Sequence, residues 1–268
     1  FSELFEHRPS LWEDSIRGPP GAAREFWQRL QHWAAFRDHP HWPRARWAKT
    51  ISVGLHGDAE PFKKQDSAFV ISCNSLLGAA PNKGFGRRWP FTVIRKNDLT
   101  DGTIDALWEV FGWSMNVSIS GILPDRDWSG NELPSGGRYV DEGWRGSLIQ
   151  IRGDWEFLCS VFRFPYWNAA GKTCWMCSAA NTVGRRLLWT AVGDSTGWRA
   201  TKRTQAAYVA ELLAQRRPVP LLFSVVSLLL SCVMADVLHC MDLGITAHVV
   251  TNVFMRCIKK RAWGATTH

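Results

Sequence analysis

Short apolar runs alternate with helix-like segments along the chain, and this pattern predicts an α/β fold. Residues Thr50–Leu55 form the first clear strand candidate, and Ser67–Leu77 and Pro90–Arg95 are the next two. Short connections separate these three segments. The pattern therefore predicts an antiparallel meander at the start of a sheet.

Two further strand–helix units follow the meander. Apolar residues recur every three to four positions in Thr103–Val117, which predicts a helix. The strand Leu148–Ile151 then runs into Asp154, and a helix-like segment begins at Trp155. Three strands, a helix, and another strand and helix make up the order of an RNase H-like mixed sheet, with an antiparallel meander followed by parallel strands and with helices flanking it.

The pattern also suggests a division of the chain. Residues 1–48 predict a linker followed by a helix over Ala22–Phe36, and residues 49–268 predict one RNase H-like domain of catalytic type. Amphipathic patterning predicts two later helices, Thr204–Arg216 and Ile245–Lys260.

The apolar stretch Val219–Ala235 allows two interpretations. Its 17 residues are close to the minimum for a membrane-spanning helix. However, prolines at 218 and 220 and β-branched residues within the run favour a buried central strand with its lead-in. We expect the strand and no membrane partner, with a membrane-anchored protein as the alternative.

Composition adds information on partners and compartment. The formal net charge of +8 and the pI near 9.3 favour an anionic partner such as DNA. Some of the 16 tryptophans could stack on bases. Seven cysteines without the spacing of a disulfide framework indicate a reducing, intracellular compartment. The sequence starts at Phe1 rather than Met, so we expect a fragment of a longer chain.

Three acids follow strand-like segments: Asp58, Asp154 and Asp236. Neighbouring strands of one sheet can bring such carboxylates together. Two divalent ions about 3.5–4 Å apart would stabilise a cluster of these negative charges. Mg²⁺ and Mn²⁺ suit oxygen ligands of this kind. The alternative for each aspartate alone is a helix cap or a turn residue.

The order of short motifs resembles the core of eukaryotic cut-and-paste DNA transposases of the CACTA and Plavaka-like types. The resemblance covers roughly residues 50 to 255. It rests on His56-Gly57-Asp58, Gly153-Asp154, Cys174-x-x-Cys177 and Asp236-x-x-His239.

This resemblance implies an RNase H-like DDE/D nuclease with a cysteine-containing insertion after the second acid, at about 165–203. Asp58 and Asp154 would be the first two catalytic acids and Asp236 the third, with Asp242 as an alternative. The protein would cut and join DNA strands with Mg²⁺ or Mn²⁺ in the nucleus, as a homo-oligomer on transposon ends. The alternative is an inactive relic or a co-opted DNA-binding protein.

The Cys174-x-x-Cys177 pair has the spacing of half a structural zinc site. His239 and Cys240 are the expected remaining ligands, and Cys159 is another possibility. Buried thiols without metal are the alternative.

Basic side chains near these motifs are candidate contacts for DNA phosphates. They are Arg152, Arg185 and Arg186. The alternative for each is a solvated surface charge.

Overall fold

The fold is described from a computed structural model. The structure describes residues 7–33, 36, 44–63, 66–78, 88–134, 136–137, 143–166, 171, 174–180, 187, 197–235 and 247–259.

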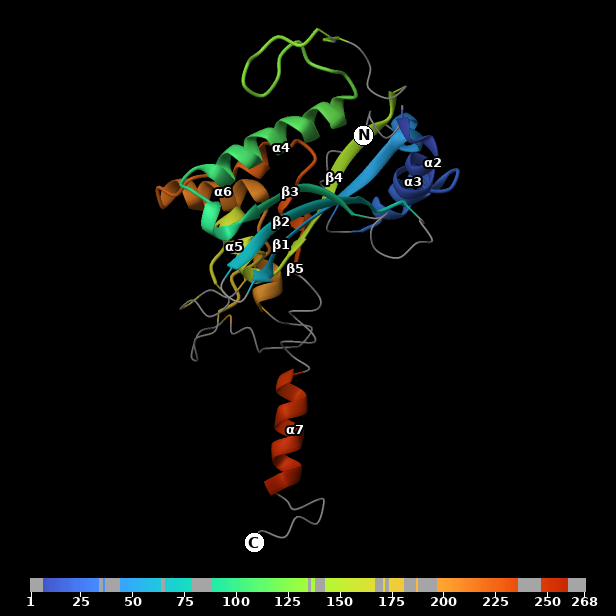
Figure 1. Ribbon diagram of the computed structural model, residues 1–268. Coiled ribbons are helices and arrows are strands. Elements are labelled where there is room, and N and C mark those ends of the chain that lie inside the picture. The colour runs from blue at the N-terminus through green and yellow to red at the C-terminus, as the bar shows by residue number, and fades with distance from the viewer. Residues whose placement is uncertain are drawn as a thin grey trace.

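A five-stranded mixed sheet forms the centre of the molecule (Figure 1). The strands lie in the order β3-β2-β1-β4-β5. Their bounds are β1 Thr50–Lys63, β2 Asp66–Ser75, β3 Trp89–Arg95, β4 Arg145–Gly153 and β5 Val233–Ala235. The pairs β1–β2 and β2–β3 are antiparallel, whereas β1–β4 and β4–β5 are parallel. The predicted α/β class and mixed sheet are confirmed.

The paired parts of β1 and β4 are mostly buried, as expected for parallel strands covered on both faces. In β1, Ile51 and Leu55 are fully buried, and in β4 Leu148 and Ile151 are fully buried too. These residues belong to one hydrophobic cluster, which extends into the helices.

The helix α4, Thr103–Ser120, crosses the sheet and packs on β4 (Figure 1). It starts after Gly102 and ends at Gly121, both with positive φ, which glycine adopts without strain. The predicted helix is therefore confirmed and is three residues longer than expected. Its buried side chains are Trp108, Phe111, Met115 and Ile119.

Two shorter helices, α5 and α6, are joined to each other by a hydrogen bond. The helix α5, Trp155–Phe162, follows β4 directly, and α6, Gln205–Ala214, is capped by Thr204, whose side chain accepts a hydrogen bond from the Ala207 amide. Tyr208 of α6 is buried, and its hydroxyl donates to the carbonyl of Phe162 over 2.9 Å. This bond joins α6 to the end of α5.

The N-terminal elements pack against the start of β1. They are α2 Pro9–Leu11, the π-helical turn η1 Trp12–Arg17, α3 Ala22–Leu30 and the 3₁₀ turn η3 Arg44–Lys49. The indole N–H of Trp27 donates to the carbonyl of Thr50 over 2.8 Å, and both residues are buried. The core side chains Trp12 and Ile16 belong to the same hydrophobic cluster as the sheet.

The prediction of a central strand over 219–235 is wrong for most of that stretch. It folds into two 3₁₀ turns, η7 Leu221–Ser224 and η8 Leu230–Cys232, and only β5 at its end is extended. In addition, β5 lies at the edge of the described sheet. Prolines at 218 and 220 and apolar side chains at a spacing of three favour turns, and the buried ones are Leu222, Val225 and Leu228.

The remaining elements are the 3₁₀ turns η4 Lys96–Asp98 and η6 Gly197–Thr201, and the helix α7, Ala247–Lys259. Helix α7 lies within the helix predicted over Ile245–Lys260, and its described apolar side chains are about half exposed. Over the described ranges, none of the helices combines the length and apolarity needed to cross a bilayer.

Candidate functional site

The register of the three parallel strands brings the residues that precede the predicted acids to one level of the sheet. Gly57 of β1 pairs with Gly153 of β4, and Gly153 pairs in turn with Ala235 of β5. Each of these residues directly precedes one of the expected acids in the sequence. The last register pairs of these three strands therefore lie at one level of the described sheet.

Asp58 and Asp154 line one small hollow, of about 180 Å³, which we call the acidic hollow. Its other lining residues are Phe69, Lys96, Leu99, Ile104, Glu156, Phe157 and Ser160. It lies where β1, the end of β4, the first turn of α5 and the start of α4 meet. Asp236 lies outside the described residues, and so does Asp242, so their roles stay predictions.

Asp154 sits at the N-cap of α5. Its backbone is extended, and its Oδ1 accepts a hydrogen bond of 2.7 Å from the amide of Phe157. The capping alternative is therefore realised for this residue. The same contact fixes the carboxylate at the positive end of the helix dipole and leaves Oδ2 without a hydrogen bond from the described part of the chain.

Asp58 does not end its strand, contrary to the sequence prediction. The strand β1 continues to Lys63 because it keeps pairing with β2, and Asp58 itself pairs with Val70. What ends beside Asp58 is the pairing with β4, whose last register pair is Gly57 with Gly153. Asp58 is half-buried at this position.

The donor set of the hollow suits a hard divalent cation only in part. Two carboxylates on adjacent strands are oxygen ligands of the type that Mg²⁺ and Mn²⁺ accept. Within the described ranges, however, no group of three His, Cys, Asp or Glu side chains is placed to hold a metal. The hollow therefore supplies two of the acids expected for such a site.

Two charged residues at the hollow were not identified from the sequence. Lys96 Nζ lies 3.3 Å from Glu156 Oε1, and both side chains are substantially exposed. Lys96 directly follows β3, and Glu156 lies two residues after Asp154. The spacing Asp154-x-Glu156 at a helix start was the available signal.

The Cys174–Cys177 loop is held against α5 and α6. The ring of Trp175 stacks on Phe164 at 5.0 Å and meets Trp155 edge-on at 4.9 Å. The guanidinium of Arg203 donates to the carbonyl of Cys177 over 3.2 Å and pairs with Glu211.

The thiols themselves are in close contact with backbone amides. The amide of Met176 lies 3.3 Å from Cys174 Sγ. Burial raises the pKa of the Cys177 thiol, the amide of Ala179 lowers it, and neighbouring Cys174 raises it. His239 and Cys240 lie outside the described residues, so the four-ligand zinc set stays a prediction. Cys159 donates instead to the carbonyl of Pro165 over 3.6 Å.

The arginines predicted to contact phosphate fall into two groups. The guanidinium of Arg152 is half-buried, and its Nη2 donates to Asn74 Oδ1 over 2.6 Å, a contact between β4 and β2. Arg185 and Arg186 lie outside the described residues. His56, beside Asp58, is half-buried and is the register partner of Arg152.

Searches against protein families, curated proteins and solved structures each found no match for this chain.

Proposed function

We propose that the chain carries an RNase H-like DDE/D nuclease domain of the transposase type, which cleaves and joins DNA strands. The observation that carries this proposal is the row Gly57, Gly153 and Ala235 across three parallel strands, each followed by an aspartate. The strand order, with an antiparallel meander before two parallel strands, supports it. The lining of one hollow by both Asp58 and Asp154 supports it further.

In this proposal, Asp58 and Asp154 hold divalent cations at the hollow, and Asp236 is the third acid. A pair of such ions would activate a water or a 3′-hydroxyl and stabilise the leaving oxygen of a phosphodiester. The N-cap contact of Asp154 restricts its rotation, so its carboxylate stays oriented without a bound partner. Preorganisation of this kind lowers the cost of assembling a site.

The chain's own cations would attract the DNA backbone. The net charge of +8 favours binding of a polyanion, and Lys96 lies at the hollow itself. Its ion pair with Glu156 is exposed, and exposed pairs contribute little, so a phosphate can replace that partner at small cost. Nuclear localisation, assembly on transposon ends and a zinc site formed by Cys174, Cys177, His239 and Cys240 belong to this same proposal.

A second candidate function is DNA binding without catalysis, as in an inactive relic. The observation that favours it is the capping role of Asp154, which gives this acid a structural reason to be present.

Metal-dependent nicking of supercoiled plasmid DNA distinguishes the two functions. The nuclease proposal predicts nicking by the wild-type protein with Mg²⁺ or Mn²⁺ and its loss in Asp58→Asn. Glu109→Gln, on the exposed side of α4, is the control and should retain activity. Binding of DNA by all three proteins with no nicking by any of them would favour the relic.

A further inference from the structure

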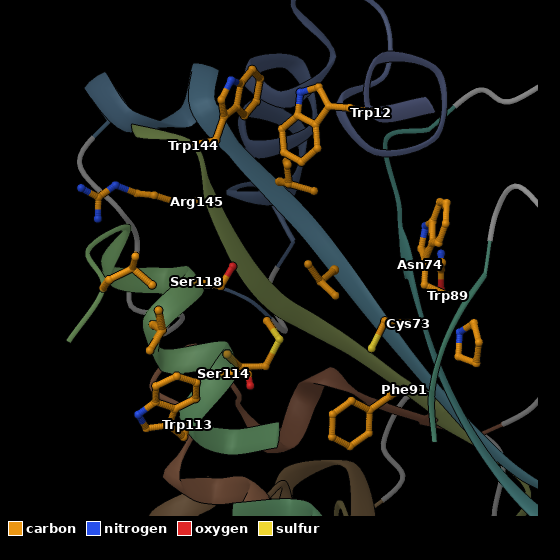
Figure 2. A pocket seen from close by; sticks show the side chains of 16 residues that line it. Trp12, Cys73, Asn74, Trp89, Phe91, Trp113, Ser114, Ser118, Trp144 and Arg145 are labelled. Carbon is orange, nitrogen blue, oxygen red and sulfur yellow. The ribbon is translucent and has the colours of Figure 1, made fainter. Parts of the chain in front are cut away.

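A second and larger pocket lies on the sheet face beneath α4, toward the C-terminal end of that helix (Figure 2). Its volume is about 490 Å³, within the usual range of small-molecule sites, roughly 300–1,000 Å³. The acidic hollow touches α4 at Ile104, whereas this pocket touches it from Trp113 to Ser118. The two sites are therefore separate, and nothing in the proposed nuclease function uses the larger one.

Aromatic rings from several distant segments form the walls, so we call it the aromatic pocket. Trp12 lies in η1, Trp89 and Phe91 lie in β3, and Trp113 lies in α4. Trp144 directly precedes β4. Ring contacts fix several of these positions. Trp12 and Trp144 meet edge-on at 5.8 Å, and Phe91 meets Phe111 of α4 edge-on at 5.1 Å. The pocket is therefore preformed rather than a gap between mobile side chains.

Two hydroxyl groups on one wall have no hydrogen-bond partner among the described residues. Ser114 and Ser118 lie one turn apart on α4, line the pocket and are only half-buried. Neither hydroxyl makes a hydrogen bond with any residue that the structure describes. Each can donate one hydrogen bond and accept others, so the pair offers a short polar edge inside an apolar cavity.

The indole N–H of Trp89 is also buried without a hydrogen-bond partner among the described residues, whereas Arg145 and Asn74 are engaged and Cys73 is uncharged. The guanidinium of Arg145 donates to the carbonyls of Ile119 and Ser120 at the end of α4. The side chain of Asn74 accepts from Arg152 and donates to the carbonyl of Ser75. Burial raises the pKa of the Cys73 thiol to about 12, which keeps it uncharged at neutral pH.

We propose that the aromatic pocket binds a small, uncharged heteroaromatic molecule of the nucleoside class, with its ring against the aromatic walls and its edge hydrogen-bonded to Ser114 and Ser118. The charged side chain of the lining, Arg145, is bonded to the carbonyls that end α4, so an anionic ligand would have to compete with them and a cationic one would meet a like charge. A pure hydrocarbon would leave both hydroxyls unsatisfied, which disfavours it. A flat ring with donors and acceptors on its edge can contact the aromatic side chains with its faces and form hydrogen bonds to Ser114 and Ser118 with its edge.

Saturation-transfer NMR with adenosine on the full chain tests this proposal. We expect saturation to reach the protons of the adenine ring more strongly than those of the ribose. The double variant Ser114→Ala/Ser118→Ala should weaken binding about thirtyfold, since each of the two lost hydrogen bonds to a neutral group contributes on the order of 1 kcal/mol and about 1.4 kcal/mol is tenfold. Alanine is the better helix former, so α4 should be retained.

Two further variants make the result specific. Ser118→Phe fills the pocket and should abolish binding, with thermal unfolding as the check that the chain is folded. Ser10→Ala, on the exposed surface of α2, is the matched control and should bind as the wild type does.

The proposal is overturned if adenosine receives no saturation from the wild-type chain, or if the double variant binds it equally well. A fluorescein-labelled single-stranded oligoadenylate DNA, followed by anisotropy, forms the last arm. Binding of that strand that depends on Ser114 and Ser118, without binding of free adenosine, would assign the pocket to an unstacked base and overturn the small-molecule assignment.

Discussion

Gly57 of β1 and Gly153 of β4 lie opposite each other in parallel register, and the ring of Phe157 fills the space that a side chain at either position would need. A Cβ atom at Gly57 would lie 1.9 Å from the Phe157 ring, and one at Gly153 would lie 2.3 Å from it. Both distances are far below contact distance. The two glycines next to the acids therefore serve the packing of α5 against the sheet.

Alanine at either glycine should destabilise the fold. We expect Gly57→Ala and Gly153→Ala each to lower the free energy of unfolding by roughly 1–3 kcal/mol, the usual cost of overpacking a core. Urea unfolding measures this. The control is Gly57→Ala in a Phe157→Leu background, where the smaller leucine side chain should reduce the cost. Gly153→Ala should gain less from that background, because its Cβ would also lie 2.7 Å from the main-chain oxygen of Gly57. Equal costs in both backgrounds would show that Phe157 is not the obstacle.

Asp154 should separate stability from catalysis. Asparagine also caps helices well, so Asp154→Asn should change stability by only a few tenths of a kcal/mol, whereas Asp154→Ala should cost about 0.5–2 kcal/mol. Both variants should lose metal-dependent nicking, because each removes a carboxylate from the hollow. Thermal unfolding and the plasmid assay measure the two effects. Full nicking by Asp154→Asn would leave this residue as a helix cap only.

The hydrogen bond between Tyr208 and Phe162 should contribute measurably to the docking of α6. Tyr208→Phe removes a buried hydroxyl whose partner is a main-chain carbonyl 2.9 Å away. The expected cost is about 1 kcal/mol in the free energy of unfolding, because the carbonyl loses its partner. Tyr166→Phe is the comparison, since Tyr166 is about half exposed and should cost nothing measurable.

The buried thiol of Cys232 should make stability fall at alkaline pH. Burial raises its pKa from an ordinary value of 9.0 to about 12. The unfolded chain therefore releases this proton first, and the contribution of Cys232 is complete below pH 9 and lost as the pH rises toward 12. Within that window one such group gives a slope of about 1.4 kcal/mol per pH unit.

Replacement of the thiol tests this slope. Cys232→Val, measured by urea unfolding at pH 8, 9 and 10, should show a shallower loss of stability with pH than the wild type. Cys257→Ala, in α7 and outside the hydrophobic cluster, is the control and should keep the wild-type slope. An unchanged slope in Cys232→Val would contradict the raised pKa.

Local pattern predicted the meander, α4 and α5 because each has apolar residues at a spacing that only one element can bury. The run 219–235 shows where this reasoning fails. Apolarity requires burial but does not distinguish an extended strand from 3₁₀ turns, and Leu222, Val225 and Leu228 are buried at a turn-like spacing.

The acidic hollow and the aromatic pocket also differ in how far a local sequence pattern could predict them. The sequence predicts Asp58 and Asp154 as neighbours because an acid after a strand is a local signal. The parallel register of β1 and β4 then places the residues before these two acids opposite each other. The length of β1 beyond Asp58 depends on its pairing with β2, which no local pattern shows. The aromatic pocket was missed because Trp12, Trp89 and Trp144 lie far apart in the sequence and meet only through the fold.

The most direct test of the central claim is anomalous diffraction from crystals grown with MnCl₂. The account predicts Mn²⁺ in the acidic hollow, ligated by the carboxylates of both Asp58 and Asp154, and its loss from Asp58→Asn crystals. Carboxyl groups more than about 10 Å apart, too far to share a pair of ions, or a hollow without Mn²⁺ in the wild type would contradict it.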